Sequence, residues 1–259
     1  MKKLKILVCG LPGSGKSYLS ERLKIILNAT WLNADKVRGE ANDWDFSVEG
    51  RIRQANRMKK LSADALNDNK HVIADFVCPT EKTRADFNAD FVIWMNTIKK
   101  GRFEDTNKVF EKPKKIDYEV NEKNADLISI LIAEKIEPHV WKNNQPTAQM
   151  LGRWQPWHKG HQTLFEEIIK KTGQVNIQVR DVKGWGDNPF SFEEVKKNIE
   201  KELSKYGDRV KITLVPNITN ICYGRGVGYK IEEIVLSEDI QSISATKIRD
   251  ELRKKGKLT

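Results

Sequence analysis

The chain has 259 residues, with few cysteines and no long apolar segment. Its three cysteines, Cys9, Cys78 and Cys222, lie far apart and predict neither a disulfide framework nor a C-x-x-C metal site. No apolar run approaches the roughly 20 residues that a membrane span needs. The basic and then apolar start leads directly into a glycine-rich loop without a cleavage site, so a signal peptide is not expected. These absences predict a cytoplasmic, reduced protein with no membrane partner.

Positive charge is in excess, with a formal net charge of +10. A basic surface attracts anions such as nucleotides, nucleic acid and phosphorylated or sulfated metabolites. The lysines are spread along the expected helices and are not massed with aromatic residues, which favours nucleotides over nucleic acid as partners. The composition leaves the oligomeric state open, a homo-oligomer included.

The most specific stretch is Gly10–Ser17, GLPGSGKS, which fits the phosphate-loop pattern G-x-x-x-x-G-K-[ST]. An apolar strand over Leu4–Cys9 precedes it, and a helix over Tyr18–Leu27 follows it. Glycines let the backbone wrap a phosphate, and the helix start points free N–H groups at the anion. Lys16 is expected to reach the outer phosphates of ATP, and Ser17 to bind Mg²⁺. The residues expected to contact ATP are Gly10, Gly13, Ser14, Gly15, Lys16 and Ser17.

Residues 1–138 alternate strand and helix signals, the pattern of an α/β fold with a doubly wound parallel sheet. The expected strands are Ala29–Leu32, Val72–Val77 and Phe91–Met95, the expected helices are Gly50–Leu66 and Ala125–Ile136, and the charged stretch Lys99–Val120 is expected to be a loop. The polar segment Pro138–Gln149 carries two prolines and breaks the helical pattern. We therefore predict a linker over residues 139–148.

Four segments of the first half, Ile6–Leu27, Asn33–Arg38, Asp45–Arg57 and Asp75–Arg84, resemble adenylylsulfate kinase. They match its phosphate loop and its D-G-D-N-x-R, G-F-S…R…N-I-R-R and A-F-I-S-P…R segments. The resemblance runs over most of residues 1–120. It implies a P-loop kinase that transfers the γ-phosphate of ATP to a hydroxyl of a small acceptor, which in that family is a sulfated adenosine nucleotide.

A kinase needs a carboxylate to receive the acceptor proton or to order Mg²⁺. Asp35 matches the second aspartate of the family's pair and is expected to act as base or metal organiser. Asp75 is either a second Mg²⁺ residue or part of a strand-end turn. Arg38 and Arg51 can fork onto an acceptor phosphate or sulfate, or form solvated ion pairs. Gln54 lies in the same acceptor segment.

Three positions depart from the family's pattern: Asn33 replaces an aspartate, Gln54 an asparagine and Cys78 a serine. These changes bear on the identity of the acceptor more than on kinase chemistry. Cys78 is expected to pack as a small buried hydrophobe, because nothing nearby in the sequence would lower its pKa.

A second strand–loop–helix unit follows, with a strand over Ala148–Leu151 and a helix over Gln162–Lys171. Between them lies H-x-G-H, in which His158 and His161 can both donate to one phosphate chain at a helix start. Gly160 lets a nucleotide approach the backbone. With no cysteine or further histidine nearby, a metal site is the less favoured interpretation.

Near the C-terminus, Ile243–Arg249 reads I-S-A-T-K-I-R and enters a helix. Ser244 and Thr246 can cap this helix and donate to a phosphate, and Arg249 can hold an outer phosphate. Together, H-x-G-H and I-S-x-T-x-x-R resemble the nucleotidylyltransferase superfamily. The form G-R-W-Q-P-W-H-K-G-H is most similar to nicotinamide-nucleotide adenylyltransferases, and the resemblance spans Gln149–Leu252.

This resemblance implies a Rossmann-like fold, in which a phosphate of a second substrate attacks the α-phosphorus of ATP and pyrophosphate leaves. ATP is favoured over CTP, because cytidylyl-transferring relatives differ in the segment after Gly152. His158 and His161 would hold the nucleotide phosphates, and Arg249 and Lys159 the leaving pyrophosphate. The other residues expected at this nucleotide are Gly152, Arg153, Gly160, Ser244 and Thr246.

The leading hypothesis is a bifunctional enzyme with a kinase over residues 1–138 and a nucleotidylyltransferase-like domain over residues 149–259. One alternative is sulfate activation with adenylylsulfate as acceptor, although residues 149–259 are too few for an ATP sulfurylase. Another is a nucleotide-binding regulator, or an RNA-binding protein, without turnover. Retention of Lys16, both motif histidines and Arg249 favours chemistry over that last alternative.

Overall fold

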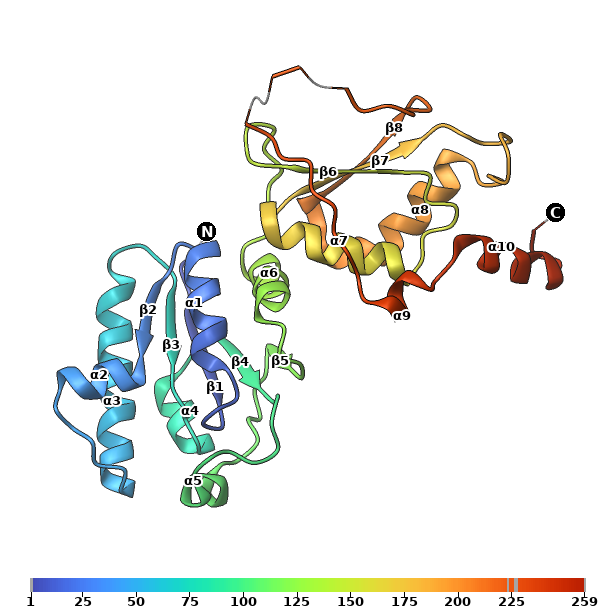
Figure 1. Ribbon diagram of the computed structural model, residues 1–259. Coiled ribbons are helices and arrows are strands. Elements are labelled where there is room, and N and C mark those ends of the chain that lie inside the picture. Colours follow the sequence, from blue (N-terminus) through green and yellow to red (C-terminus); the bar gives the residue numbers. More distant parts are fainter. Residues whose placement is uncertain (1, 223, 226–227, 259) are drawn as a thin grey trace. The chain divides into compact units, whose positions relative to one another are not determined.

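The computed structural model describes residues 2–222, 224–225 and 228–258 and divides into two compact units, Met1–Glu137 and Pro138–Thr259 (Figure 1). The predicted domains also contain residues 1, 223, 226, 227 and 259, which lie outside the described residues. No helix within the described ranges is both long enough and apolar enough to span a bilayer.

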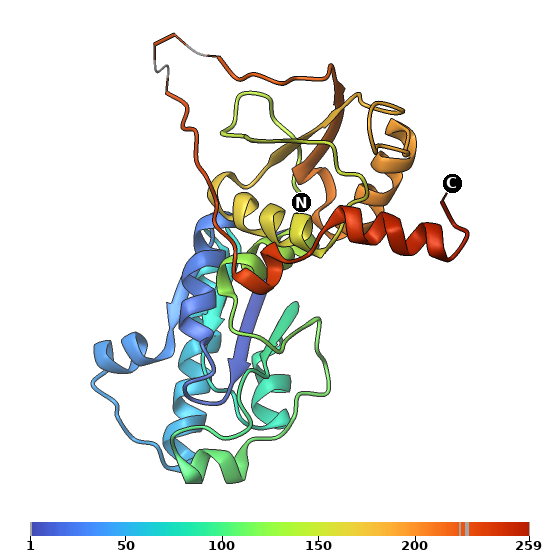
Figure 2. The same ribbon diagram turned by 45° about the vertical axis from the view of Figure 1, so that its right-hand side comes forward.

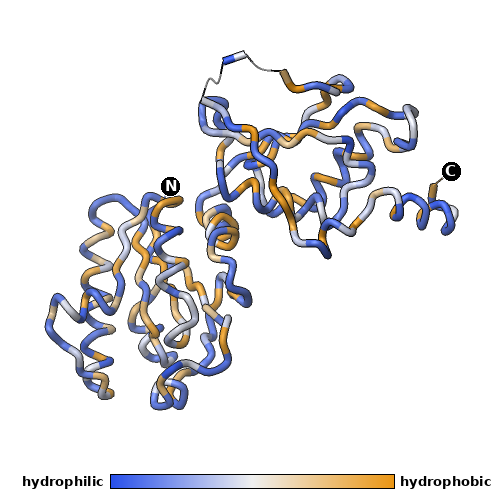
Figure 3. The backbone as a smooth tube through the Cα atoms, viewed as in Figure 1, coloured by the Kyte–Doolittle hydropathy of each residue, from blue (hydrophilic) through white to orange (hydrophobic). Residues whose placement is uncertain are grey.

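In the described residues, the first unit contains a parallel five-stranded sheet in the order β2-β3-β1-β4-β5. Its strands are β1 (Lys5–Gly10), β2 (Thr30–Asn33), β3 (Val72–Asp75), β4 (Phe91–Met95) and β5 (Tyr118–Val120). The central strands β1, β3 and β4 are mostly apolar, as expected for strands buried on both faces, and they are largely orange in Figure 3. Because the strands are parallel, their carboxyl ends share one edge of the sheet.

Helices cover both faces of this sheet. On β1, Ile6 and Val8 pack in one core cluster with residues of α1 (Lys16–Ile26) and α6 (Ala125–Ile136). The alternate residues, Leu7 and Cys9, pack in a second cluster that includes Met58 of α3 (Val48–Leu66) and Phe87 of α4 (Glu81–Phe87). This alternation is the period of two that a strand imposes, and it confirms a mixed α/β arrangement.

The described part of the second unit contains a parallel three-stranded sheet in the order β6-β7-β8. Its strands are β6 (Ala148–Gly152), β7 (Val175–Arg180) and β8 (Val210–Val215). Its helices are α7 (Lys159–Thr172), α8 (Phe192–Leu203), the 3₁₀ helix η1 (Ser204–Arg209), α9 (Glu238–Gln241) and α10 (Ala245–Lys254), the last drawn in red in Figure 2. This unit is therefore also mixed α/β with a parallel sheet.

Several predicted boundaries need correction. The stretch Lys99–Val120, predicted as a loop, contains the six-residue helix α5 (Glu104–Val109) and the three-residue strand β5. From its apolar spacing alone the sequence predicts one helix over Phe192–Tyr206, but α8 ends at Leu203, where the chain continues as η1. The short helix α2 (Ala34–Glu40) was not expected at all. In each case the missed element is too short to show a periodic apolar pattern.

The segment predicted as a linker is hydrogen-bonded to the second unit through buried Gln174. The Nε2 atom of Gln174 donates to the carbonyl oxygen of Lys142 (2.9 Å) and to the hydroxyl of Thr147 (2.5 Å). Its Oε1 atom lies 3.1 Å from Nε2 of His139. These contacts hold residues 139–147 against the start of β7.

Candidate functional sites

The glycine loop has one glycine, Gly10, at which no side chain fits. A Cβ atom on Gly10 (φ +148°) would lie 2.7 Å from the carbonyl oxygen of Met95. Gly15 precedes α1 in a left-handed conformation, and no side chain caps the helix, so its first N–H groups remain available to an anion. The hydroxyl of Ser14 is buried and has no hydrogen-bond partner in the described residues. An uncapped helix start and an unpaired buried hydroxyl fit a bound phosphate.

Lys16 places a cation inside this loop. Its Nζ atom donates to the carbonyl oxygen of Leu11 at 3.1 Å. Burial lowers the pKa of Lys16, and the nearby carboxylates of Asp75 and Asp35 act in the opposite direction. A phosphate is a stronger partner for an ammonium group than a neutral carbonyl is. Lys16 can therefore exchange its carbonyl for a phosphate.

Asn33 joins the two groups that the sequence assigns to Mg²⁺. Its Nδ2 atom donates to Oγ of Ser17 and to Oδ2 of Asp75, each at 3.0 Å. Its Oδ1 atom accepts the backbone N–H of Lys36 (3.2 Å), which fixes the orientation of the amide. Burial raises the pKa of Asp75, while hydrogen bonds from Ser17 and Asn33 and the charge of Lys16 oppose that shift. Ser17, Asn33 and Asp75 therefore form one connected set at the carboxyl ends of the strands.

These residues fit a magnesium ion that arrives together with ATP. Asp35 lies exposed in the first turn of α2, close enough to influence Lys16 and Asp75 electrostatically. Hydroxyl and carboxylate oxygens are the ligands that Mg²⁺ prefers, and in kinases phosphates and water supply the rest. Within the described ranges, no group of three or more His, Cys, Asp or Glu residues could hold a metal by itself.

Arg38, predicted to bind the acceptor, is used inside the protein. Its Nη1 atom donates to the backbone carbonyl oxygens of Asp43 and Asp45, each at 2.9 Å. Its guanidinium carbon lies 4.7 Å from the ring centroid of Phe46. Only 5% of Arg38 is exposed. In this conformation Arg38 holds the loop between α2 and α3.

The other two predicted acceptor residues support the same loop and its surroundings. Arg51 donates to the carbonyl oxygen of Phe46 (2.8 Å) and forms an ion pair with Asp105 of α5. Gln54 is buried and donates to the carbonyl oxygen of Ala34 at 3.0 Å. The structure thus places Arg38, Arg51 and Gln54 around one loop but directs their polar groups to protein partners.

The loop after β4 supplies residues that the sequence reasoning missed. Thr97 donates from its hydroxyl to a backbone carbonyl of the glycine loop at 2.6 Å. The backbone of Gly101 is held by the side chain of Asn107 through two hydrogen bonds, of 2.8 and 3.1 Å. Next to it, Nε of exposed Arg102 lies 3.6 Å from where a Cβ on Gly13 would be. The sequence held one signal for Arg102: it is a basic residue that follows the strand Phe91–Met95, and the carboxyl end of that strand lies beside the glycine loop.

Cys78 is only 1% exposed, which confirms its predicted packing in the core. Burial raises the pKa of its thiol to about 12. Because the thiolate is the reactive form, Cys78 is not suited to act as a nucleophile.

The two motif histidines of the second unit lie face to face. Their ring centroids are 3.6 Å apart, and Nδ1 of His158 accepts the backbone N–H of Gly160 at 3.1 Å. Burial, and secondarily His158, lowers the pKa of His161 to about 3; the rings of Trp154 and Trp157 pack against it. Burial also lowers the pKa of His158. Both histidines are therefore neutral at pH 7 and can offer N–H donors to a phosphate, without positive charge.

The residues before the histidines form a packed corner. A Cβ on Gly152 would lie 2.5 Å from the ring of Trp154, so glycine is needed there for the indole. Trp154 donates from Nε1 to the carbonyl oxygen of Gln178 at 3.0 Å. The side chain of Gln155 makes two hydrogen bonds with the backbone of Phe190, of 2.8 and 2.9 Å. In this structure Gly152 serves the packing of the corner.

Arg249 brings the two motifs of the second unit together. Its guanidinium donates to the backbone carbonyl of Gln155, to Oδ2 of Asp187 (2.8 Å) and to the hydroxyl of Thr246 (3.1 Å). The predicted side-chain cap of α10 is not present, because Ser244 makes no capping hydrogen bond and the hydroxyl of Thr246 accepts from Arg249. The sequence reasoning also missed Asp187, an acidic residue in a glycine-flanked turn.

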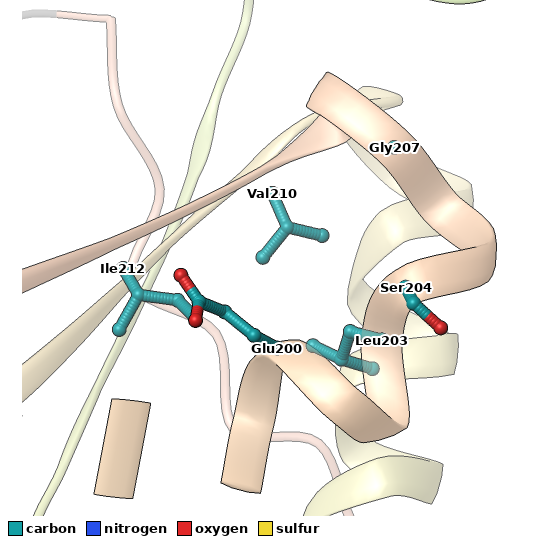
Figure 4. Close-up of a pocket in the computed structure, with 6 residues that line it drawn as sticks. All are labelled: Glu200, Leu203, Ser204, Gly207, Val210 and Ile212. Atoms are coloured by element: carbon teal, nitrogen blue, oxygen red, sulfur yellow. The ribbon is translucent and has the colours of Figure 1, made fainter. Parts of the chain in front are cut away.

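Two pockets in the second unit differ in their surroundings. One, of about 590 Å³, is lined in part by His158, Lys159, Lys201 and Lys205, so it adjoins the histidine motif. The other, of about 230 Å³, contains no residue of either motif. It is lined by Glu200, Leu203, Ser204, Gly207, Val210 and Ile212 (Figure 4).

Arg153, which the sequence predicts to contact the nucleotide of the second unit, is exposed.

Known proteins resemble parts of this chain. The family described as AAA domain matches residues 6–92. A nicotinamide-nucleotide adenylyltransferase of Methanococcus aeolicus is 36% identical over 61 residues, which are 23% of this chain and 36% of that protein. The solved APS kinase of Mycobacterium tuberculosis, in complex with AMPPNP and APS, is 21% identical over 53% of this chain and 99% of its own, with a TM-score of 0.41. Shikimate kinase of Acinetobacter baumannii is 17% identical over 52% of this chain and 93% of its own, with a TM-score of 0.38.

The AAA-domain match supports a P-loop domain in the first unit. The likenesses to solved kinases have TM-scores below 0.5 and bear neither on the activity of this chain nor on its substrates. The matched segment spans about a third of the length of the curated adenylyltransferase. The activity of that relative is therefore a matter of proposal for this chain.

Proposed function

We propose that the first unit is an ATP-dependent kinase that transfers the γ-phosphate to a hydroxyl of a phosphorylated or sulfated small molecule. The observation that carries this proposal is the hydrogen-bonded set of Ser17, Asn33 and Asp75 beside Lys16. Ser17 and Asp75, with Asp35 nearby, would hold Mg²⁺, which when bound draws charge from the outer phosphates.

In this kinase, positioning and charge would do most of the work, since phosphoryl transfer needs little covalent help from the protein. The loop N–H groups would bind the phosphates, and Lys16 would leave Leu11 for an outer phosphate. Asp35 would accept a hydrogen bond from the acceptor hydroxyl and receive its proton. Arg102 would add positive charge over the loop.

We propose that the second unit transfers the adenylyl group of ATP to a phosphate of a second substrate. A new P–O bond forms between that phosphate and the α-phosphorus, and the bond to the leaving pyrophosphate breaks. The contact of Arg249 with Gln155, which are 94 residues apart, supports this proposal because it joins the two nucleotidylyltransferase motifs. His158 and His161 would donate N–H groups to the α-phosphate, and Arg249, Arg153 and Lys159 would meet the leaving group.

We assign the kinase to residues 1–138, the linker to residues 139–148 and the transferase to residues 149–259. A kinase followed by an adenylyl transferase makes chemical sense as two consecutive steps. The first step would place a phosphate on a small molecule, and the second would cap that phosphate with a nucleotide. This order predicts that the product of the first unit is a substrate of the second.

Isotope-labelled ATP tests both activities on a panel of acceptors that includes adenylylsulfate. We expect the γ-label to pass to an acceptor and the α-label to pass to the phosphorylated product. Lys16→Ala should abolish only ADP release, and His161→Ala only pyrophosphate release when phosphorylated acceptor is supplied, so each variant controls for the other. Lys24→Ala, at an exposed lysine of α1, should retain both activities. Failure of every acceptor to take up either label would contradict the proposal.

A further inference from the structure

Asp187 occupies the two arginines at the C-terminal motif of the second unit. Its Oδ2 atom accepts from Nε of Arg249 at 2.8 Å, and its Oδ1 atom accepts from Nη2 of Arg253. Only 7% of Arg249 is exposed, whereas the Asp187 side chain is 41% exposed. Hydrogen bonds from Arg253 and Arg249 lower the pKa of Asp187. A charged carboxylate therefore lies on the guanidinium groups that the motif would offer to a phosphate.

The turn that carries Asp187 is a small self-contained loop. The N–H of Gly184 donates to the carbonyl oxygen of Asn188 (3.0 Å), and the side chain of Asn188 donates back to the carbonyl oxygen of Trp185. Gly184 and Gly186 have φ values of +75° and +61°, and a Cβ on either would meet nothing closer than 3.9 Å. Trp185 is 61% exposed. The tip of this turn packs against little else, so Asp187 can leave the arginines without disturbing a core.

Carboxylates and phosphates bind guanidinium groups through the same parallel N–H donors. A polyphosphate on Arg249 must therefore take the place of Asp187. We infer that Asp187 competes with the polyphosphate end of the nucleotide, and so sets how weakly the second unit holds pyrophosphate. This inference rests on the proposed adenylyl transfer. It makes Asp187 a residue that governs affinity for the leaving group, so that pyrophosphate departs readily after transfer.

Titration calorimetry with inorganic pyrophosphate tests this inference on the full chain. Lys16→Ala serves as the background, so that the glycine loop does not mask the second unit. Asp187→Asn removes the charge and keeps the shape. Ion pairs at the surface are weak, so the loss of the Asp187 charge should tighten pyrophosphate binding by about fivefold and no more. Asp250→Asn is the matched control, because Asp250 forms an ion pair with Arg253 and is 55% exposed. The pyrophosphate affinity of this variant should stay within about twofold of the background.

Hydrogen exchange gives a second measurement that does not depend on turnover. Pyrophosphate should accelerate exchange at the amides of residues 184–188, because the turn leaves the arginines. Asp187→Ala provides a second variant in case Asp187→Asn misfolds, and its melting temperature is recorded to show that it folds. It should bind pyrophosphate more tightly than the background, as Asp187→Asn does. Unchanged or weaker binding in both Asp187 variants would overturn the inference.

Measuring adenylyl transfer on the same samples separates the two proposals. If the Lys16→Ala background transfers adenylyl groups but the Asp187 and Asp250 variants bind pyrophosphate equally, only the role of Asp187 is overturned. Absence of both transfer and pyrophosphate binding in every variant overturns that role and the proposed function of the second unit together. Transfer accompanied by tighter pyrophosphate binding and slower product release in Asp187→Asn supports both.

Discussion

The glycine loop of the first unit and the histidine motif of the second present opposite electrostatic arrangements. In the loop, the ammonium of Lys16 has a neutral carbonyl as its hydrogen-bond partner, and the start of α1 has no side-chain cap. In the histidine motif, His158 caps α7 and both imidazoles are neutral, while Arg249 is paired with Asp187. The first arrangement offers the charge of Lys16 to an anion, whereas in the second the imidazoles are neutral and Arg249 already has a carboxylate partner. We therefore expect the first to bind polyphosphates more tightly than the second.

The largest effect should come from removing the space that the glycine loop needs. Gly10→Ala puts a Cβ 2.7 Å from a backbone oxygen at a φ of +148°. The clash and the strained backbone together should lower the free energy of unfolding by about 3 kcal/mol or more and abolish ATP binding to the first unit. Thermal unfolding and calorimetry measure both. Gly224→Ala, where a Cβ meets nothing within 4 Å, is the control and should be neutral; wild-type ATP affinity in Gly10→Ala would refute the predicted role of the loop.

A smaller effect is expected at the corresponding corner of the second unit. Gly152→Ala puts a Cβ 2.5 Å from the ring of Trp154, a side chain that can shift more easily than backbone. Overpacking of this kind costs about 1–3 kcal/mol. The free energy of unfolding should fall by that amount, and pyrophosphate release should decline while ADP release persists. A loss of both activities would show that the two units do not act separately.

The next effect concerns the connection between Ser17 and Asp75. Asn33→Ala removes the hydrogen bonds to Ser17 and Asp75, each of which contributes about 0.5–1.5 kcal/mol, and also the one accepted from Lys36. The Mg²⁺ concentration needed for half-maximal ADP release should therefore rise about tenfold. Calorimetry of ADP with and without Mg²⁺ provides a readout apart from turnover. Asn67→Ala, at the exposed end of α3, is the control. An unchanged metal requirement would mean that Asn33 does not position the metal site.

The smallest effect should appear in the pH dependence of stability. In the folded protein the pKa of His161 is about 3, below the ordinary histidine value of 6.5, so as the pH falls the unfolded chain takes up a proton at this residue before the folded chain does. The free energy of unfolding should therefore fall as the pH drops from 6.5 towards 3, by about 1 kcal/mol at pH 5.5. Denaturant titrations of the wild type and His161→Gln at pH 7 and 5.5 measure this difference. If the free energy of unfolding fell by the same amount between pH 7 and 5.5 in both proteins, His161 would not be desolvated in the fold.

Long apolar patterns made much of the fold predictable from sequence. The predicted strand Phe91–Met95 and helix Ala125–Ile136 have the boundaries of β4 and α6, because buried and mainly apolar residues make up most of both segments. The helix α2 escaped prediction because it depends on one local interaction, the Asn33 side chain that accepts from Lys36. The strand β5 escaped because three residues carry no period, and it is defined by pairing with β4.

The candidate sites were predictable only where their residues are contiguous. The pattern GLPGSGKS located the glycine loop, yet nothing local shows that Asn33 would connect Ser17 to Asp75 or that Arg102 would lie beside Gly13. Those contacts arise because parallel strands place their carboxyl ends together. The pairing of Arg249 with Asp187 likewise joins segments 62 residues apart, and no sequence period encodes it.

The two proposed activities require two separate sites for ATP in one chain. Titration calorimetry with a non-hydrolysable ATP analogue and Mg²⁺ measures their number directly. We predict two sites per wild-type chain, with the tighter one lost in Lys16→Ala and the weaker one lost in His161→Ala. A single site in the wild type, or one variant that removes both, would contradict the account.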